Sequence, residues 1–261
     1  MGFFDHGHVL RAAAFTCGLL SFGTTTFAGP AGLPYGLTFT VDSGQPFGLS
    51  ASPIYGGGIQ IKWDGVAHKL EDERVQLALC DGDREHCASE AALKFLAIVD
   101  SGRQREGRAR IGEINRAINL SIRAVDDLVQ YGQVDVWSSP LVTFYRGAGD
   151  CEDYAIAKYV ALSMAGIPAE DLRIVVVINT IRHEGHAVAA VRLDGHWLML
   201  DNMRMAMVED SYVRNYRPLY VIGETGVMRY SNMPVLAGMP EQDAVAAIAL
   251  NSEGGLIAAS D

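Results

Sequence analysis

Two extended runs joined by Asp194-Gly195 constrain the fold of this chain more than any other feature. The runs cover 186–193 and 196–201, and each carries the apolar and β-branched residues that strands favour. An Asp-Gly dipeptide between two such runs is typical of a β-hairpin that closes with a two-residue turn. A turn of this length places Leu193 opposite His196, so it fixes the register of the whole hairpin.

The same register brings an imidazole and a carboxylate together. Asp201 falls opposite Val188, and His186 lies two residues from Val188, on the same face of the sheet. Diagonal neighbours on one face are close enough for long side chains to touch. We therefore predict a His186–Asp201 contact at the open end of the hairpin, whereas a slip of one residue would put the two side chains on opposite faces.

A cysteine lies at the predicted start of a helix, in the stretch Gly149-Asp150-Cys151-Glu152-Asp153. Asp150 is a typical N-cap, because its side chain can accept hydrogen bonds from the free amides of the first turn. Cys151 then occupies the first helical position, where the helix dipole favours a thiolate. The helix is expected to end near Met164, ahead of Gly166. This stretch alone leaves two alternatives open, a small buried hydrophobic residue or a nucleophile.

Helical patterns precede the hairpin and extended patterns surround it. Isoleucines and valines at three- and four-residue steps predict a helix over 111–131, and shorter helices are expected at 71–79 and 89–99. The β-branched run 172–178 predicts a buried central strand, and a further short strand is expected at 219–222. The chain is therefore expected to form an α+β fold in which N-terminal helices pack on an antiparallel sheet.

The two ends of the chain differ in composition from this domain. A short apolar run followed by Thr26-Phe27-Ala28 predicts an export signal over 1–28, with a mobile N-terminal tail as the alternative. Residues 28–65 are rich in Gly, Pro and Ser and are interpreted as loop and edge structure. We expect the folded domain to cover 29–230 and a flexible tail to follow over 231–261.

The charge of the chain excludes one class of partner. Its formal net charge is −10 at pH 7, whereas a protein that binds nucleic acid needs a basic face. With 49% hydrophobic and 20% charged residues, the chain has the composition of a globular protein with a substantial core.

Export also changes the meaning of the cysteines. Removal of the signal would leave Cys80, Cys87 and Cys151. Cys80 and Cys87 enclose a polar, turn-like loop, which could close as a disulfide in an oxidising compartment; two unpaired thiols are the alternative. A zinc site is disfavoured because no second ligand pair has suitable spacing. If the disulfide forms, Cys151 is left unpaired, which favours a reactive thiol.

These predictions together outline a Cys-His-Asp arrangement. The Cys151 thiolate would attack a carbonyl group, His186 would carry the proton, and Asp201 would orient the ring and stabilise its cationic form. The amide of Cys151 at the helix start is a natural oxyanion donor. Trp137 is expected to be buried, where its indole could line the site; a core aromatic is the alternative.

The sequence resembles the bacterial transglutaminase-like cysteine peptidases of the LapG type. The resemblance covers roughly residues 75–222 and assigns the nucleophile to Cys151, the general base to His186 and the third member to Asp201. It implies a papain-like/transglutaminase-like fold. The matching segments are Asp135-Val136-Trp137-Ser138-Ser139-Pro140, Gly149-Asp150-Cys151-Glu152-Asp153-Tyr154-Ala155-Ile156-Ala157-Lys158-Tyr159, Gly166-Ile167-Pro168, His186-Ala187-Val188 and Leu200-Asp201-Asn202.

The resemblance also implies a calcium ion (Ca²⁺) beside the nucleophile, held by Asp150 and Glu152 with Asp153 as a further contributor. Electrostatics point the same way, because three carboxylates beside a thiol raise its pKa and oppose its activation. A hard divalent cation that binds their oxygens would cancel this field and fix the helix start. The alternative is that Asp150 only caps the helix while the other two acids face solvent.

We therefore interpret the chain as a periplasmic cysteine endopeptidase that acts on an exported or cell-surface protein. The resemblance implies a cell-surface, adhesin-like substrate in biofilm formation and an inner-membrane cyclic-di-GMP receptor as partner. Two alternatives stay open. The same three residues can catalyse transglutamination or amide deamidation, because the acyl-enzyme step is shared; a non-catalytic binding module of the same fold is the other.

Overall fold

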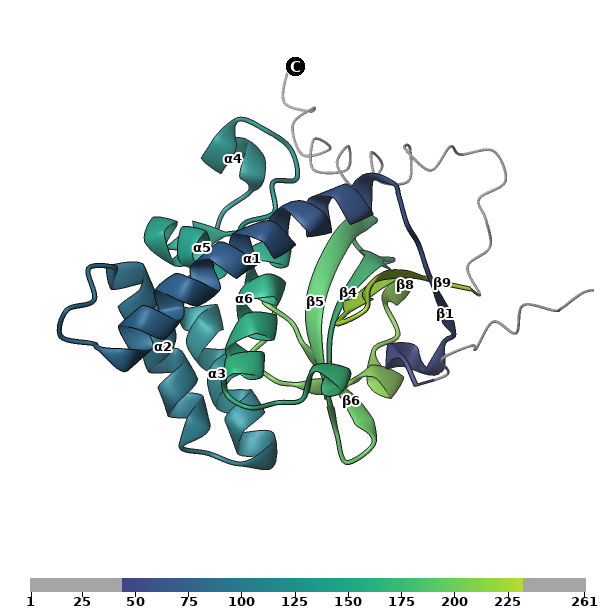
Figure 1. Ribbon diagram of the computed structural model, residues 1–261. Helices are drawn as coiled ribbons and strands as arrows, with labels where there is room; N and C mark the ends of the chain where they lie inside the picture. Colours follow the sequence, from purple (N-terminus) through teal and green to yellow (C-terminus); the bar gives the residue numbers. More distant parts are fainter. Residues whose placement is uncertain (1–43, 232–261) are drawn as a thin grey trace, which may run out of the picture. The chain divides into compact units, whose positions relative to one another are not determined.

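The computed structural model describes residues 44–231 (Figure 1). Within these residues the α-helices come before all strands of the antiparallel main sheet except its short first one, so the predicted α+β class is confirmed. The helices are α1 (Gly58–Gly82), α2 (Glu90–Arg103), α3 (Gly107–Ser121), α4 (Asp127–Tyr131), α5 (Pro140–Arg146) and α6 (Cys151–Met164). The strands are β1 (Ala51–Pro53), β2 (Arg123–Ala124), β3 (Ala148–Gly149), β4 (Leu172–Asn179), β5 (Glu184–Leu193), β6 (His196–Leu200), β7 (Val208–Glu209), β8 (Tyr216–Gly223) and β9 (Gly226–Tyr230). Three short 3-10 helices cover Pro46–Gly48, Ala169–Asp171 and Asp210–Tyr212.

The ends of the chain fall outside this description. The predicted export signal (1–28) lies outside the described residues, and so does the predicted tail (231–261) apart from Ser231. Within residues 44–231, no helix combines the length and apolar character that crossing a membrane requires.

The main sheet has seven antiparallel strands in the order β1-β9-β8-β4-β5-β6-β7. The strand predicted over 172–178 is β4, and it lies at the centre of the sheet as expected. β5 and β6 form the predicted hairpin with Leu193 opposite His196, so the register derived from the Asp194-Gly195 turn is confirmed.

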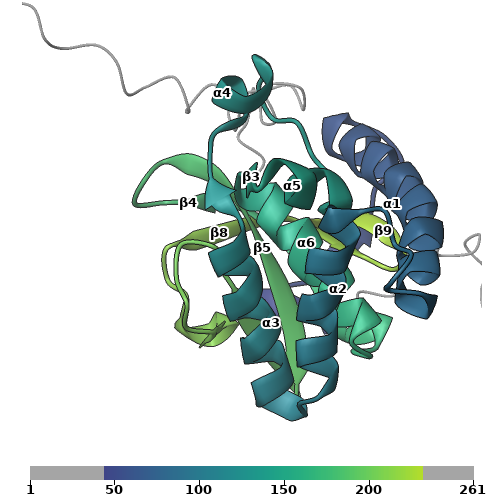
Figure 2. The same ribbon diagram turned by 90° about the vertical axis from the view of Figure 1, so that its left-hand side faces the viewer.

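Opposite faces of the sheet pack against different parts of the chain. Ala189 and Val191 of β5 face the helices and join the core formed by α2, α3, α5 and α6. Val188 and Ala190 face the other way and pack with Ala51 and neighbouring N-terminal residues. Figures 1 and 2 show α6 lying against β5, with α2 and α3 outside it. α6 is therefore held between the sheet and the outer helices.

The first helix begins much earlier than predicted. The segment 28–65 was interpreted as loop and edge structure, yet α1 begins at Gly58 and replaces the short helix expected at 71–79. Ile59, Trp63 and Val66 recur at helical spacing and are buried, so they hold this first part of α1 in the core. The glycines of the segment conceal this pattern in the sequence.

The helix predicted over 111–131 is broken in two. α3 ends at Ser121, and Ile122 takes an extended conformation with φ −111 and ψ 134. The chain then forms β2 before α4, where the Asp126 side chain accepts a hydrogen bond from the Leu128 amide at 3.1 Å. This break brings Asp127 to the candidate active site.

A disulfide joins Cys80 to Cys87, as predicted, at the end of α1.

Candidate active site

The cysteine is the first residue of α6, as the sequence predicts, and it is the only free cysteine among the described residues. It is half-buried, and the short parallel pair of β2 and β3 leads directly into it. Asp150 occupies the N-cap position, but the predicted hydrogen bond from its side chain to the first turn is absent. That prediction is wrong because the Asp150 carboxylate turns towards other acids, and its Oδ1 is buried without a hydrogen-bond partner.

The predicted imidazole–carboxylate contact is present at the end of the hairpin. His186 Nε2 lies 3.0 Å from Asp201 Oδ1, and both side chains are buried. Asp201 follows β6 directly, so the register of the hairpin positions the two groups. Because Nε2 faces the carboxylate, Nδ1 is the ring nitrogen left for other partners.

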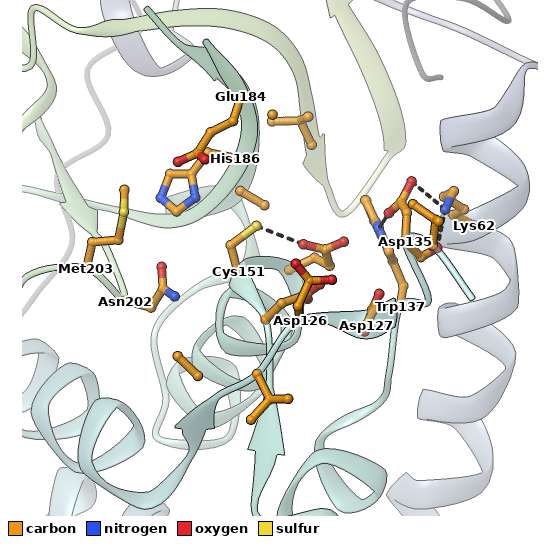
Figure 3. A pocket seen from close by; sticks show the side chains of 18 of the residues that line it. Lys62, Asp126, Asp127, Asp135, Trp137, Cys151, Glu184, His186, Asn202 and Met203 are labelled. Atoms are coloured by element: carbon orange, nitrogen blue, oxygen red, sulfur yellow. Dashed lines mark hydrogen bonds and ion pairs between the residues drawn. The ribbon is translucent and has the colours of Figure 1, made fainter. Parts of the chain in front are cut away.

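The sulfur of Cys151 faces the same cleft as His186 (Figure 3). The backbone amide of Ala187, next to His186 on β5, donates a hydrogen bond towards this sulfur. The thiol itself lies 2.8 Å from Glu152 Oε2 and donates to it. The structure thus brings the three predicted catalytic side chains, Cys151, His186 and Asp201, to one site.

The Asp201 carboxylate has a partner on every side. Oδ1 also accepts from the Met203 amide at 3.0 Å, and Oδ2 accepts from the Tyr216 hydroxyl at 2.6 Å and pairs with Arg204 at 3.2 Å. Burial tends to raise the pKa of Asp201, but the hydrogen bonds and the charge of His186 outweigh it and hold this pKa well below its usual range. Asp201 is therefore held as an anion beside the imidazole.

A second group of acids surrounds the helix start on the other side of the cysteine. Asp127, Asp150 and Glu152 each direct a carboxylate oxygen to one place, with these atoms within 4.8 Å of one another. Sequence analysis missed Asp127, because the helix predicted through this region made it an ordinary helical side chain. The paired Asp126-Asp127, typical of a helix N-terminus, was the signal available.

The remaining predicted metal ligand is oriented differently. Asp153 Oδ1 accepts a hydrogen bond from the Ser138 amide at 2.8 Å, and Asp153 lies outside the group of three converging oxygens. It is fully buried beneath the helix start, where it ties α6 to the segment before α5. The structure therefore groups Asp150 and Glu152 with Asp127, where the sequence had grouped them with Asp153.

The acid cluster, which comprises Asp127, Asp150 and Glu152, holds like charges in a buried place. Burial and then the neighbouring acids raise the pKa of Asp150 to about 11, and burial and Asp135 raise the pKa of Glu152 to about 8. Burial, Glu152 and Asp150 also raise the pKa of the Cys151 thiol well above its usual value. The effect on the thiol has the direction that the sequence predicted.

The donor set of this cluster fits a hard divalent cation. Ca²⁺ binds carboxylate oxygens, and Asp127 Oδ1 and Asp150 Oδ1 are both buried without a hydrogen-bond partner. Buried oxygens in this state cost free energy unless another group satisfies them. A bound cation would satisfy them and offset the repulsion between the carboxylates.

The cleft above the cysteine has a volume of about 400 Å³. One side is formed by residues around β2 and α4, and the other by the β4–β5 loop and the residues after β6. Trp137 lines it as predicted, and its Nε1 donates to Asp135 Oδ1 at 2.8 Å. Lys62 reaches the cleft from α1 and pairs with Asp135 at 2.6 Å. Sequence analysis missed Lys62 because it lay in a presumed loop.

Comparison with known proteins identifies relatives of this arrangement. A sequence model of the bacterial transglutaminase-like cysteine proteinase BTLCP family matches residues 75–221. No curated protein sequence matches the chain.

Solved structures of LapG from Legionella pneumophila share the fold. One has 22% identity and a TM-score of 0.50, and the match covers 60% of this chain and 86% of that one. An EGTA-treated form has 21% identity and a TM-score of 0.50, with 66% and 94% covered. A calcium-bound form has 23% identity and a TM-score of 0.49, with 60% and 88% covered.

Proposed function

Because this chain belongs to the bacterial transglutaminase-like cysteine proteinase family and is a cysteine peptidase, we propose that it is an exported endopeptidase that uses Cys151, His186 and Asp201. The observation that carries this proposal is the buried His186–Asp201 pair, which shares a cleft with the free thiol of Cys151. The export signal predicted over 1–28 and the Cys80–Cys87 disulfide support a periplasmic location, because disulfides persist in oxidising compartments.

Acylation follows from the positions of these groups. The Cys151 sulfur bonds to the scissile carbonyl carbon, and His186 Nδ1 takes the thiol proton and delivers it to the amine as the C–N bond breaks. The Cys151 amide at the start of α6 would donate to the oxyanion as it develops. Asp201 stabilises the imidazolium meanwhile. Water, deprotonated by His186, then displaces the sulfur and releases the second product.

We also propose that activity depends on calcium, held by Asp127, Asp150 and Glu152. The buried oxygens without partners support this assignment, and LapG of Legionella pneumophila has been solved in calcium-bound and EGTA-treated forms. When bound, the ion would neutralise the carboxylates beside the thiol and fix the start of α6.

The proposed substrate is an exported or cell-surface protein of the adhesin type, and the proposed regulator is an inner-membrane cyclic-di-GMP receptor. Both follow from the family resemblance. The test compares the surface proteins that are released by wild-type cells and by cells that carry Cys151→Ala. A protein released only by the wild type supports the proposal, whereas identical release contradicts this substrate class.

A second experiment separates the possible acceptors. Candidate surface proteins are incubated with the purified chain and analysed by mass spectrometry. New internal termini show hydrolysis of the main chain. Cross-links show that a side-chain acyl group was transferred to an amine, and deamidated glutamines show that it was transferred to water. Fragments that also form with Cys151→Ala would contradict catalysis by this thiol.

A further inference from the structure

The two-residue strand β2 lies at the edge of the cleft and has one strand neighbour. Within residues 44–231 it pairs in parallel with β3 alone. The Arg123 amide donates to Gly147 O at 3.1 Å, and the Val125 amide donates to Gly149 O at 3.0 Å. β3 continues through the N-cap into the nucleophile, so the pairing holds β2 beside Cys151.

Ala124 lies between these two bonded residues. Backbone polar groups of successive residues point to opposite sides of a strand. Because Arg123 and Val125 face β3, Ala124 directs its N–H and C=O away from β3. No other strand of the described part of the chain pairs with this side, and Ala124 is exposed and lines the cleft. One donor and one acceptor are thus left for a molecule in the cleft.

We propose that the open edge of β2 at Ala124 binds the main chain of the substrate as an added strand, so that the enzyme selects extended polypeptide. This inference rests on the proposed function. An unpaired strand edge accepts an extended peptide through main-chain hydrogen bonds, while side-chain pockets supply the sequence preference.

The opposite wall of the cleft fits this mode of binding. Asn202 and Met203 line the cleft directly after the catalytic Asp201, and Val125 and Val134 line it on the β2 side. A strand bound at Ala124 would therefore pass between two partly apolar walls. Folded segments, whose main-chain groups are already bonded, would be excluded.

The test measures cleavage of a defined peptide. A tryptic digest of exported proteins from the source cells is incubated with the full chain, and a peptide that is cut is synthesised as the probe. Active sites are counted by stoichiometric alkylation of Cys151, so that a loss of folded protein does not enter the rate. kcat/KM is then measured for the wild type, Ala124→Pro and Ala124→Ser.

Ala124→Pro removes the N–H that points away from β3 and leaves the hydrogen bonds of Arg123 and Val125 to β3 in place. Proline is tolerated at strand edges. We expect kcat/KM to fall about tenfold, mainly through a higher KM, as the loss of one hydrogen bond would give. Ala124→Ser restores the amide and is expected to recover most of the cleavage. Equal values for the proline and serine variants would overturn the inference and leave the proposed function intact.

A second measurement avoids any distortion of the site that the proline variant could cause. Single N-methyl groups are placed along the probe peptide and tested with the wild-type enzyme. One methylated position near the scissile bond is expected to reduce kcat/KM about tenfold, because its N–H can no longer reach Ala124 O. Uniform cleavage of all N-methylated peptides would overturn the inference. If the wild type cuts no peptide of the digest, the proposed endopeptidase function fails, and this inference fails with it.

Discussion

Asp201 and the acid cluster lie on either side of Cys151, and they differ in how their carboxylate oxygens are satisfied. Asp201 is 1% exposed and Asp127 is 2% exposed, so burial does not distinguish them. Both oxygens of Asp201 have partners, whereas Asp127 Oδ1 and Asp150 Oδ1 have none. The pKa of Asp201 is accordingly lowered, and burial raises the pKa of Asp127.

The difference agrees with the two proposed roles. A carboxylate with a full set of donors is pre-organised, so it can orient His186 without any change in its surroundings. A group of acids with free oxygens is incomplete: burial and mutual repulsion raise the pKa values of Asp150 and Glu152, so these acids hold protons that a bound cation would replace. The Asp201 carboxylate is thus complete in the protein alone, whereas the acid cluster has the open oxygens that the proposed cation would fill.

The largest effect is expected where the complete carboxylate is changed. Asp201→Asn keeps the shape of the side chain but replaces one carboxylate oxygen with an NH₂ group, which faces the hydrogen-bond donors that surround Asp201. His186 also loses its anionic partner. We expect kcat/KM to fall by a factor of about 10²–10⁴ and the free energy of unfolding to fall by about 1–3 kcal/mol. Steady-state kinetics and urea unfolding measure the two effects. Asp72→Asn, at an exposed position of α1, is the control. A variant within threefold of the wild type would contradict the assigned role.

The acid cluster is expected to respond to calcium rather than to lose its fold. At a free concentration one hundred times Kd, calcium should stabilise the wild type by about 2.7 kcal/mol relative to protein in EGTA. Because the raised pKa of Asp150 makes folding without calcium take up a proton at neutral pH, Asp150→Asn removes this cost, so it should raise the Tm in EGTA and lose most of the gain from calcium. Scanning calorimetry with calcium, magnesium and EGTA measures this, with Asp72→Asn as the control. A wild-type Tm that does not change with calcium would contradict a metal role.

The positions of His186, Asp201 and Cys151 could be predicted because they depend on local geometry. The Asp194-Gly195 turn sets the register, the register sets the face, and the face brings His186 to Asp201. The helix start at Cys151 follows in the same way from neighbouring residues. Each step depends on a few positions that are adjacent in sequence or directly paired across one hairpin.

The positions of Asp127 and Lys62 could not be predicted in the same way. Asp127 reaches Asp150 only because the chain breaks at Ile122 and pairs β2 with β3, and the valines that follow continue a helical spacing through this break. Lys62 reaches Asp135 only because tertiary packing holds the glycine-rich start of α1 as a helix. Contacts between segments far apart in sequence leave no periodic signal in either one.

About two turns after Cys151, α6 carries a buried amine. Lys158 is fully buried and donates to Leu200 O at 3.0 Å, next to Asp201. Burial, opposed in part by the charge of Asp201, lowers the pKa of Lys158 to about 7 from an ordinary value of 10.5. Between these two values the unfolded chain binds more protons than the folded one. The contribution of Lys158 to the free energy of unfolding therefore rises with pH between pH 7 and 10.5, by at most about 1.4 kcal/mol per pH unit, and is lowest below pH 7.

Lys158→Met removes this titration and keeps most of the side-chain volume. We expect the difference in unfolding free energy between wild type and variant to increase in favour of the wild type from pH 7 to pH 9, measured by urea unfolding at each pH. Lys94→Met, at an exposed position of α2, is the control and should leave the pH slope of the wild type unchanged. Parallel curves for wild type and Lys158→Met would show that the buried amine keeps an ordinary pKa.

The smallest effect tests a single hydroxyl in each environment. The Tyr216 hydroxyl donates to Asp201 Oδ2 at 2.6 Å, whereas the Tyr230 hydroxyl is buried without a partner among the described residues. Tyr216→Phe should lower the free energy of unfolding by about 1 kcal/mol and kcat by about tenfold or less, with KM unchanged, because Arg204 and the Met203 amide still hold the carboxylate. Tyr230→Phe removes an unsatisfied group of equal size, so it should be neutral or slightly stabilising and leave kcat unchanged. Equal losses in the two variants would show that ring packing, and not the hydrogen bond to the catalytic acid, determines the effect of Tyr216.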